Sequence, residues 1–158
     1  MAANSAGAAL PYESLTSTSG RALIPCSLRV LLVDDSEFQR LVACALLARW
    51  GILPDIASDG VEAVRLAGES DFDIVLMDVE MPVMDGLAAT ACIRQLERER
   101  GLGAGVPVVA YTAGGLAANE ARWRECGMDA VLQKPSDAFA MGECLHRWCG
   151  DKFPAAQH

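Results

Sequence analysis

The sequence predicts a doubly wound α/β domain in which five parallel strands alternate with five helices. From residue 28 to residue 150, short apolar runs alternate with longer amphipathic segments, which is the pattern of repeated βα units. The run Ile74-Val75-Leu76-Met77 is continuously apolar, as expected for a strand that helices cover on both faces. A chain of 158 residues with 52% hydrophobic content is long enough for one buried core and too short for two ordinary domains.

Each predicted strand is a short apolar run. The first run ends at Asp34-Asp35 and the third ends at Asp78, so polar residues mark where these strands stop. The predicted strands are residues 29–33, about 55–57, 74–77, 107–111 and 130–133.

The predicted helices carry apolar residues at helical spacing and have recognisable ends. Asp59-Gly60 opens the second helix, Gly68 lies near its end, and Gly127 is the expected stop of the fourth. The first helix carries Leu41, Val42, Ala45, Leu46 and Arg49 and runs to about Trp50-Gly51. The later helices are expected at about residues 87–100, 116–126 and 137–149.

The chain divides into a core domain and two terminal segments. Residues 1–26 are rich in Ala, Ser, Gly and Thr, have almost no charge and show no hydrophobic period, which predicts a flexible extension. An alternative is a cap that docks through Leu23 and Ile24. The domain is expected over residues 27–150, followed by a tail at 151–158.

Composition excludes several classes of protein. The net charge of −8, from 13 Lys+Arg against 21 Asp+Glu, argues against nucleic-acid binding, which needs clustered basic residues. No apolar run is long enough to span a bilayer, and no secretory signal is present, so a soluble, cytoplasmic protein is expected. The cysteines form no CxxC pair and are interpreted as reduced thiols: Cys26, Cys44, Cys92, Cys126, Cys144 and Cys149.

Chemically distinctive residues follow four of the predicted strands. Asp34 and Asp35 follow the first, Asp78 the third, Thr112 the fourth and Lys134 the fifth, so all of them should meet at the carboxyl edge of the sheet. Clustered carboxylates repel one another unless a cation neutralises them, and Mg²⁺ accepts carboxylates while leaving positions for phosphate oxygens. Lys134 and Thr112 add a cation and a hydroxyl donor for phosphoryl oxygens.

This set of residues favours phosphoryl transfer to a carboxylate. It has no histidine base, no paired serine or cysteine nucleophile and no phosphate-cradling glycine loop, so positioning and charge neutralisation would do most of the catalysis. Asp78 is the candidate nucleophile because it ends the central strand alone, whereas the adjacent Asp34 and Asp35 suit metal binding.

The segments VLLVDDSEFQR, VLMDVEMPVMDGLAAT, VVAYTA and GMDAVLQKP closely resemble receiver domains of two-component systems, and the resemblance covers residues 28 to about 149. It implies a flavodoxin-like fold with strand order 2-1-3-4-5, Mg²⁺ or Mn²⁺ as cofactor, and Asp78 as phosphoacceptor. Asp35, Asp78 and the Glu80 carbonyl would bind the ion directly, and Asp34 would assist through water.

The same resemblance assigns the remaining site residues. Thr112 would be the hydroxyl switch, Lys134 the phosphate-binding lysine, and the Lys134-Pro135 bond would be cis. The MPxMDG form at residues 81–86 is most similar to receivers of hybrid kinases and phosphorelays.

One position departs from the family pattern. Many receivers carry Tyr or Phe three residues before the lysine, and this chain carries Val131. An aliphatic side chain cannot swing a ring inward, so signalling is expected to depend more on docking at the first helix. Phe38, Leu41 and Val42 are the candidate docking residues for a histidine kinase or a phosphotransfer protein, although core packing is the alternative for Leu41 and Val42.

The expected function is that of a single-domain response regulator, monomeric or weakly dimeric. It would accept a phosphoryl group from phosphohistidine onto Asp78 and signal by a conformational switch, partner contact or onward transfer, as a self-dephosphorylating phosphoacceptor rather than a conventional turnover enzyme. Three alternatives stay open. They are a phosphate sink, a phosphorylation-independent interaction module, and an aspartate-nucleophile phosphatase, which would need DxD where this chain has Asp78-Val79-Glu80.

Overall fold

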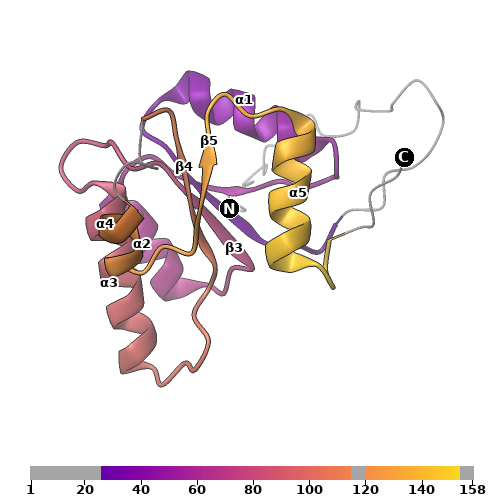
Figure 1. Cartoon of the computed structure of the whole chain (residues 1–158). Coiled ribbons are helices and arrows are strands. Elements are labelled where there is room, and N and C mark those ends of the chain that lie inside the picture. The colour runs from indigo at the N-terminus through magenta and orange to yellow at the C-terminus, as the bar shows by residue number, and fades with distance from the viewer. Residues whose placement is uncertain (1–25, 115–119, 154–158) are drawn as a thin grey trace, which may run out of the picture.

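The computed structural model describes residues 26–114 and 120–153 and shows a parallel sheet between two layers of helices (Figure 1). The strands are β1 (Val30–Val33), β2 (Asp55–Ala57), β3 (Ile74–Met77), β4 (Val108–Thr112) and β5 (Ala130–Gln133). The helices are α1 (Glu37–Ala48), α2 (Gly60–Glu69), α3 (Gly86–Glu99), α4 (Glu120–Glu125) and α5 (Ala138–Cys149). The strand order β2-β1-β3-β4-β5, with every pair parallel, confirms the predicted fold.

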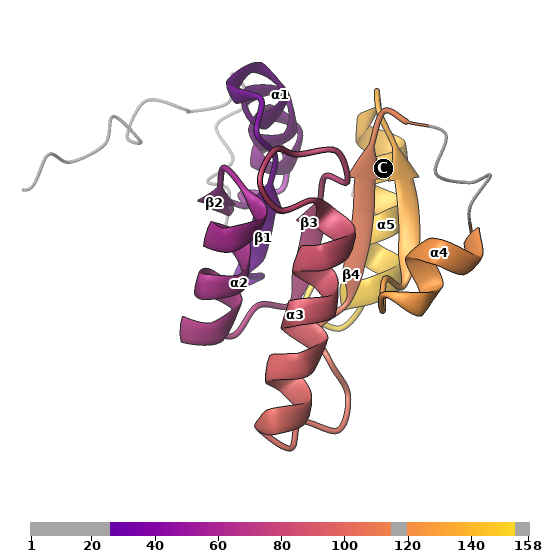
Figure 2. The same ribbon diagram turned by 90° about the vertical axis from the view of Figure 1, so that its left-hand side faces the viewer.

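Successive residues of the central strands point into two separate cores. Leu31, Val33, Val75 and Met77 belong to the core under α2, α3 and α4. Their strand neighbours belong to the core under α1 and α5: Val30, Leu32, Ile74 and Leu76. Figure 2 shows α2 and α3 in front of the sheet and α5 behind it. Burial on both faces explains why these strands are continuously apolar.

Four of the helices begin with a side-chain cap. Ser36, Asp59, Asp85 and Asp137 each accept a hydrogen bond from a backbone N–H three residues later, at the start of α1, α2, α3 and α5 respectively. Such caps satisfy amide groups that have no partner inside the helix. At the other end of a helix, Gly127 adopts a φ of 100° just after α4, which confirms its predicted role as a helix stop.

The structure excludes core packing, which was the alternative for Leu41 and Val42 of α1. Ala43 and Leu47 are the buried residues of this helix, whereas Leu41, Val42 and Ala45 are exposed. The inward stripe is the pair four residues apart that lies over the sheet. Because one member of that pair is a small alanine, the stripe was less visible in the sequence than the larger exposed residues.

The packed domain extends beyond its predicted end at residue 150. Phe153 is buried in the core under α1 and α5, and its ring lies 5.5 Å from that of Trp50. Residues 151–153 therefore belong to the folded domain, and the rest of the predicted tail lies outside the described residues. A single aromatic residue after a helix has no periodicity, so sequence patterning could not reveal this contact.

Other predictions fall partly or wholly outside the described residues. These are the extension and its alternative docking through Leu23 and Ile24, and residues 116–119 of the fourth helix. All six cysteines are free thiols, as predicted. Within the described part of the chain, no helix is long and apolar enough to cross a membrane.

Candidate functional site

The carboxyl ends of β1, β3, β4 and β5 bring the candidate residues to one edge of the sheet. Val33 of β1 lies beside Met77 of β3, so the next residues, Asp34 and Asp78, emerge at the same level. The Asp78 N–H donates to the Val33 carbonyl at 2.9 Å and fixes this register. On the other side of β4, the Lys134 N–H donates to the Thr112 carbonyl at 2.9 Å.

Asp34, Asp35 and Asp78 form a compact carboxylate cluster. One oxygen from each of them lies within 4.8 Å of the others. Asp34 is 2% exposed and Asp78 is 9% exposed, whereas Asp35 is exposed. Backbone N–H groups orient the two buried members, because Ser36 donates to Asp34 Oδ1 and Val79 donates to Asp78 Oδ1, each at 2.9 Å.

Lys134 supplies the positive charge of the site. Its buried ammonium group contacts Asp34 Oδ2. The buried Thr112 hydroxyl accepts a bond from the Gly114 N–H at 3.4 Å. The Lys134-Pro135 peptide bond is cis. The structure therefore brings together all five residues that the sequence placed at the strand ends.

The electrostatics of the site leave it with unbalanced negative charge. Burial raises the pKa of Asp78 to about 6; the Lys134 ammonium opposes this, and the Asp34 carboxylate adds to it. Three carboxylates lie near one ammonium group, so additional positive charge at this place would stabilise the charged form of Asp78. The oxygen donors fit a hard divalent cation such as Mg²⁺.

Glu80 and Val131 lie at the edges of this site. The Glu80 side chain is exposed, and a Cβ added to Gly114 would lie 3.5 Å from Glu80 Oε1. The Glu80 carboxylate is not part of the Asp34, Asp35 and Asp78 cluster. Val131 is partly buried against the core under α2, α3 and α4. The metal-binding role of the Glu80 carbonyl remains a prediction.

Gly86 is a site residue that sequence reasoning treated only as part of a turn. Its N–H donates to the Val79 carbonyl at 2.8 Å. A Cβ at this position would lie 2.0 Å from the Asp78 carbonyl oxygen. The absence of a side chain therefore allows α3 to start directly against the Asp78 backbone. Asp85-Gly86 read as a common turn signal, which concealed this close approach.

Gly86→Ala is expected to lower the free energy of unfolding by about 1–3 kcal/mol, since the added methyl group must displace backbone atoms. Gly103→Ala is the matched control, because a Cβ there meets no atom within 4 Å. Urea denaturation of both variants measures the difference. Equal stability of Gly86→Ala and wild type would contradict the close approach of Gly86 to the Asp78 carbonyl.

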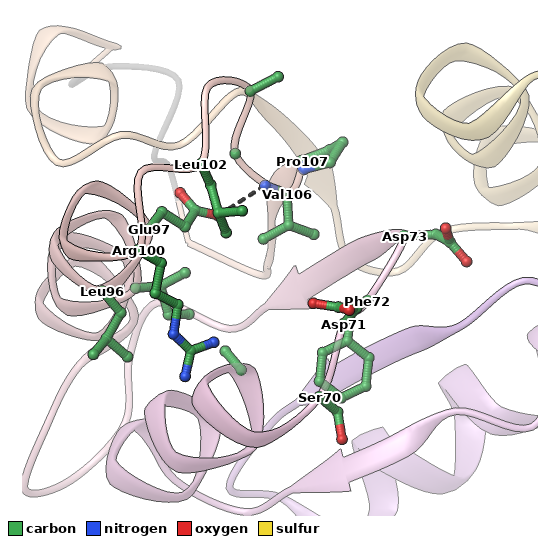
Figure 3. A pocket seen from close by; sticks show the side chains of 14 residues that line it. Ser70, Asp71, Phe72, Asp73, Leu96, Glu97, Arg100, Leu102, Val106 and Pro107 are labelled. Carbon is green, nitrogen blue, oxygen red and sulfur yellow. Dashed lines mark hydrogen bonds between the residues drawn. The ribbon is translucent and has the colours of Figure 1, made fainter.

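A cavity of about 330 Å³ lies at the opposite edge of the sheet, between the α2–β3 loop, the end of α3 and the α3–β4 loop. Figure 3 shows Arg100, Leu96, Ser70 and Phe72 around it, and the hydrogen bond from the Val106 N–H to Glu97. None of the predicted site residues lines this cavity. This cavity is therefore separate from the candidate site.

Comparison with known proteins identifies the family. The family model described as "Response regulator receiver domain" matches residues 30–145. The chain belongs to this family. Histidine kinase 5 of Arabidopsis thaliana is 34% identical, in an alignment that covers 76% of this chain and 15% of that kinase. This receiver domain chain thus spans a small part of the length of that relative.

Solved receiver domains share the fold. One is the receiver domain of sensor histidine kinase PA1611 from Pseudomonas aeruginosa, which has a magnesium ion coordinated in its active site cleft. It is 35% identical to this chain with a TM-score of 0.68, and the match covers 78% of this chain and 98% of that one. A second match comes from the co-crystal structure of the Ssk1 receiver domain with the histidine phosphotransfer protein Ypd1 from Saccharomyces cerevisiae. The sequence identity is 26% and the TM-score is 0.74, and the match covers 84% of this chain and 96% of that one.

Proposed function

We propose that this receiver domain accepts a phosphoryl group from a phosphohistidine donor onto Asp78. The observation that carries the proposal is the buried Asp78 carboxylate, held within 4.8 Å of two further carboxylates and on the same sheet edge as the Lys134 ammonium. Such an arrangement suits phosphoryl transfer, in which positioning and charge neutralisation contribute most of the catalysis.

Asp34, Asp35, Asp78 and the Glu80 carbonyl would hold Mg²⁺, which supplies charge neutralisation for the carboxylates and the incoming phosphoryl group. An Asp78 carboxylate oxygen attacks phosphorus, and the imidazole nitrogen of the donor leaves with the electron pair of the broken P–N bond. The Val79 N–H keeps Oδ1 of Asp78 oriented during this step.

Lys134 and Thr112 would bind the phosphoryl oxygens. The Lys134 ammonium, which contacts Asp34, exchanges that carboxylate for an oxygen of the aspartyl phosphate. The Thr112 hydroxyl donates to a second oxygen and moves toward it, which couples the chemistry to the β4–α4 loop. With Val131 in place of an aromatic residue, the output depends on partner contact or onward transfer to another histidine.

The docking surface for the phosphohistidine protein would be the exposed apolar side of α1 near the carboxylates, namely Phe38, Leu41 and Val42. Phe38 is 71% exposed and Leu41 is 63% exposed. Exposed apolar residues grouped on one helix commonly mark protein interfaces. The partner class is a histidine phosphotransfer protein or a histidine kinase, as in the complex of the Ssk1 receiver with Ypd1.

Phe38→Ser is expected to slow transfer from a phosphorylated histidine phosphotransfer protein about 10-fold, as for loss of an interface anchor. Its rate with acetyl phosphate should be unchanged, because the small donor needs no docking surface. Val61→Ser on α2 is the control, since Val61 is similarly apolar and exposed. Equal slowing with both donors would place the defect in the site rather than in docking.

The direct test of the proposed function is incubation of the chain with acetyl phosphate, with Mg²⁺ or with EDTA, followed by intact mass and by hydroxylamine trapping of acyl phosphates. We expect one phosphoryl adduct, dependent on the metal ion and mapped to Asp78. An absent adduct would favour the interaction-module alternative. An adduct at another residue would refute the assignment of Asp78.

A further inference from the structure

Tyr111 contacts Lys134 and also the loop that carries it. It lies in β4 directly before Thr112, and its side chain is 3% exposed in the core under α1 and α5. The Lys134 Nζ atom lies 4.9 Å from the centroid of its ring. Its hydroxyl lies 2.9 Å from Ser136 Oγ, two residues beyond Lys134. One side chain of β4 thus touches two points of the β5–α5 connection.

We propose that Tyr111 is a positioning residue that holds the Lys134 ammonium in place for the phosphoryl group. This role rests on the proposed function of Asp78 and Lys134. The tyrosine reaches no reacting atom itself, so its effect on phosphoryl transfer passes through the lysine.

The Tyr111 ring stabilises the Lys134 charge in addition to the contact with Asp34. A lysine ammonium is a point charge on a flexible four-carbon stem, and burial of Lys134 removes most of the water that would solvate it. The face of an aromatic ring attracts a cation, most strongly where water is excluded. The ring is uncharged and does not compete with oxygen ligands, so it can support the ammonium both when Asp34 is its partner and when a phosphoryl oxygen is.

The hydroxyl of Tyr111 fixes the backbone that carries Lys134. Ser136 is followed by Asp137, whose carboxylate caps α5 by accepting from the Ala140 N–H at 2.8 Å. On the other side, the Lys134 N–H is bonded to β4 through the Thr112 carbonyl. The Tyr111–Ser136 bond therefore attaches the middle of this short connection to β4 and limits how far Lys134 can shift.

The test compares Tyr111→Leu, which removes the ring, with Tyr111→Phe and Ser136→Ala, which remove only the hydroxyl contact. Tyr111→Leu should lower the rate constant of Mg²⁺-dependent phosphorylation by acetyl phosphate roughly 5- to 30-fold. Three variants remove the same hydrogen bond and should therefore lower this rate constant by the same factor, about 2- to 10-fold. They are Tyr111→Phe, Ser136→Ala and the double variant. The dissociation constant for Mg²⁺ should stay unchanged, since carboxylates bind the ion. Far-UV circular dichroism and urea denaturation check each fold.

A second cycle, in the Lys134→Ala background, separates positioning from general packing. If Tyr111 acts through Lys134, adding Tyr111→Leu to Lys134→Ala leaves the phosphorylation rate unchanged. A further loss equal to that seen in the wild-type background would overturn the positioning role, as would a wild-type rate in both Tyr111→Leu and Tyr111→Phe. Absence of any adduct on the wild-type chain would instead overturn the proposed function and this role together.

Discussion

Asp78→Asn is expected to abolish the phosphoryl adduct formed with acetyl phosphate and Mg²⁺. An asparagine amide has nearly the shape of the carboxylate but lacks the charged oxygen that attacks phosphorus. The neighbouring acids are not expected to substitute for it, because Asp34 is paired with Lys134 and Asp35 is proposed to bind the metal ion. Intact mass measured over time gives the rate for each variant.

Asp59→Asn is the matched control for this loss. Asp59 lies in the loop after β2 and caps α2 by accepting from the Glu62 N–H at 2.8 Å, and asparagine is an equally good cap. Its adduct should form at the wild-type rate. Formation of a metal-dependent adduct on Asp78→Asn at a comparable rate would show that another residue is the acceptor.

The same Asp78→Asn substitution is expected to stabilise the metal-free protein at neutral pH. Burial raises the pKa of Asp78 from 3.8 to about 6, so the native state binds a proton more tightly than the unfolded chain does. Stability contributed by this group is therefore highest below the unfolded pKa and falls as the pH rises from about 4 to 6. Above pH 6 the charged carboxylate costs the fold on the order of 2–3 kcal/mol.

Urea denaturation in EDTA measures this effect. Asp78→Asn should exceed wild type in unfolding free energy by about 1–3 kcal/mol near pH 7.5, and the difference should shrink toward zero near pH 4. Asp151→Asn, at an exposed position, should behave as wild type throughout. A destabilised Asp78→Asn, or a gain independent of pH, would contradict the charge imbalance inferred for the site.

The site could be found from sequence because strand ends are easy to recognise. Each apolar run stops at a polar residue, and parallel strands bring their carboxyl ends to one edge, so Asp34, Asp78 and Lys134 could be grouped without coordinates. The strand order came from the family resemblance, because local patterning does not specify which strands are neighbours. The structure confirms that order.

Contacts between elements could not be predicted in this way. The approach of Gly86 to the Asp78 carbonyl, the stacking of Tyr111 under Lys134 and the packing of Phe153 on Trp50 each depend on how two separate segments meet in space. The buried face of α1 was also hard to see in the sequence, because it consists of Ala43 and Leu47, whereas the larger Leu41 and Val42 are exposed. Hydrophobicity alone does not distinguish a core face from an interface.

The proposed metal-dependent site is tested most directly by a calorimetric titration of Mg²⁺ into wild type and into single variants of the carboxylate cluster. We expect one ion per chain for wild type, with binding weakened at least about 10-fold in Asp35→Asn and in Asp78→Asn, since each substitution removes a charged ligand. Asp151→Asn should bind as wild type does. Binding that is absent from wild type, or that is unaffected by loss of either carboxylate, would contradict a metal-dependent phosphoacceptor site at this edge of the sheet.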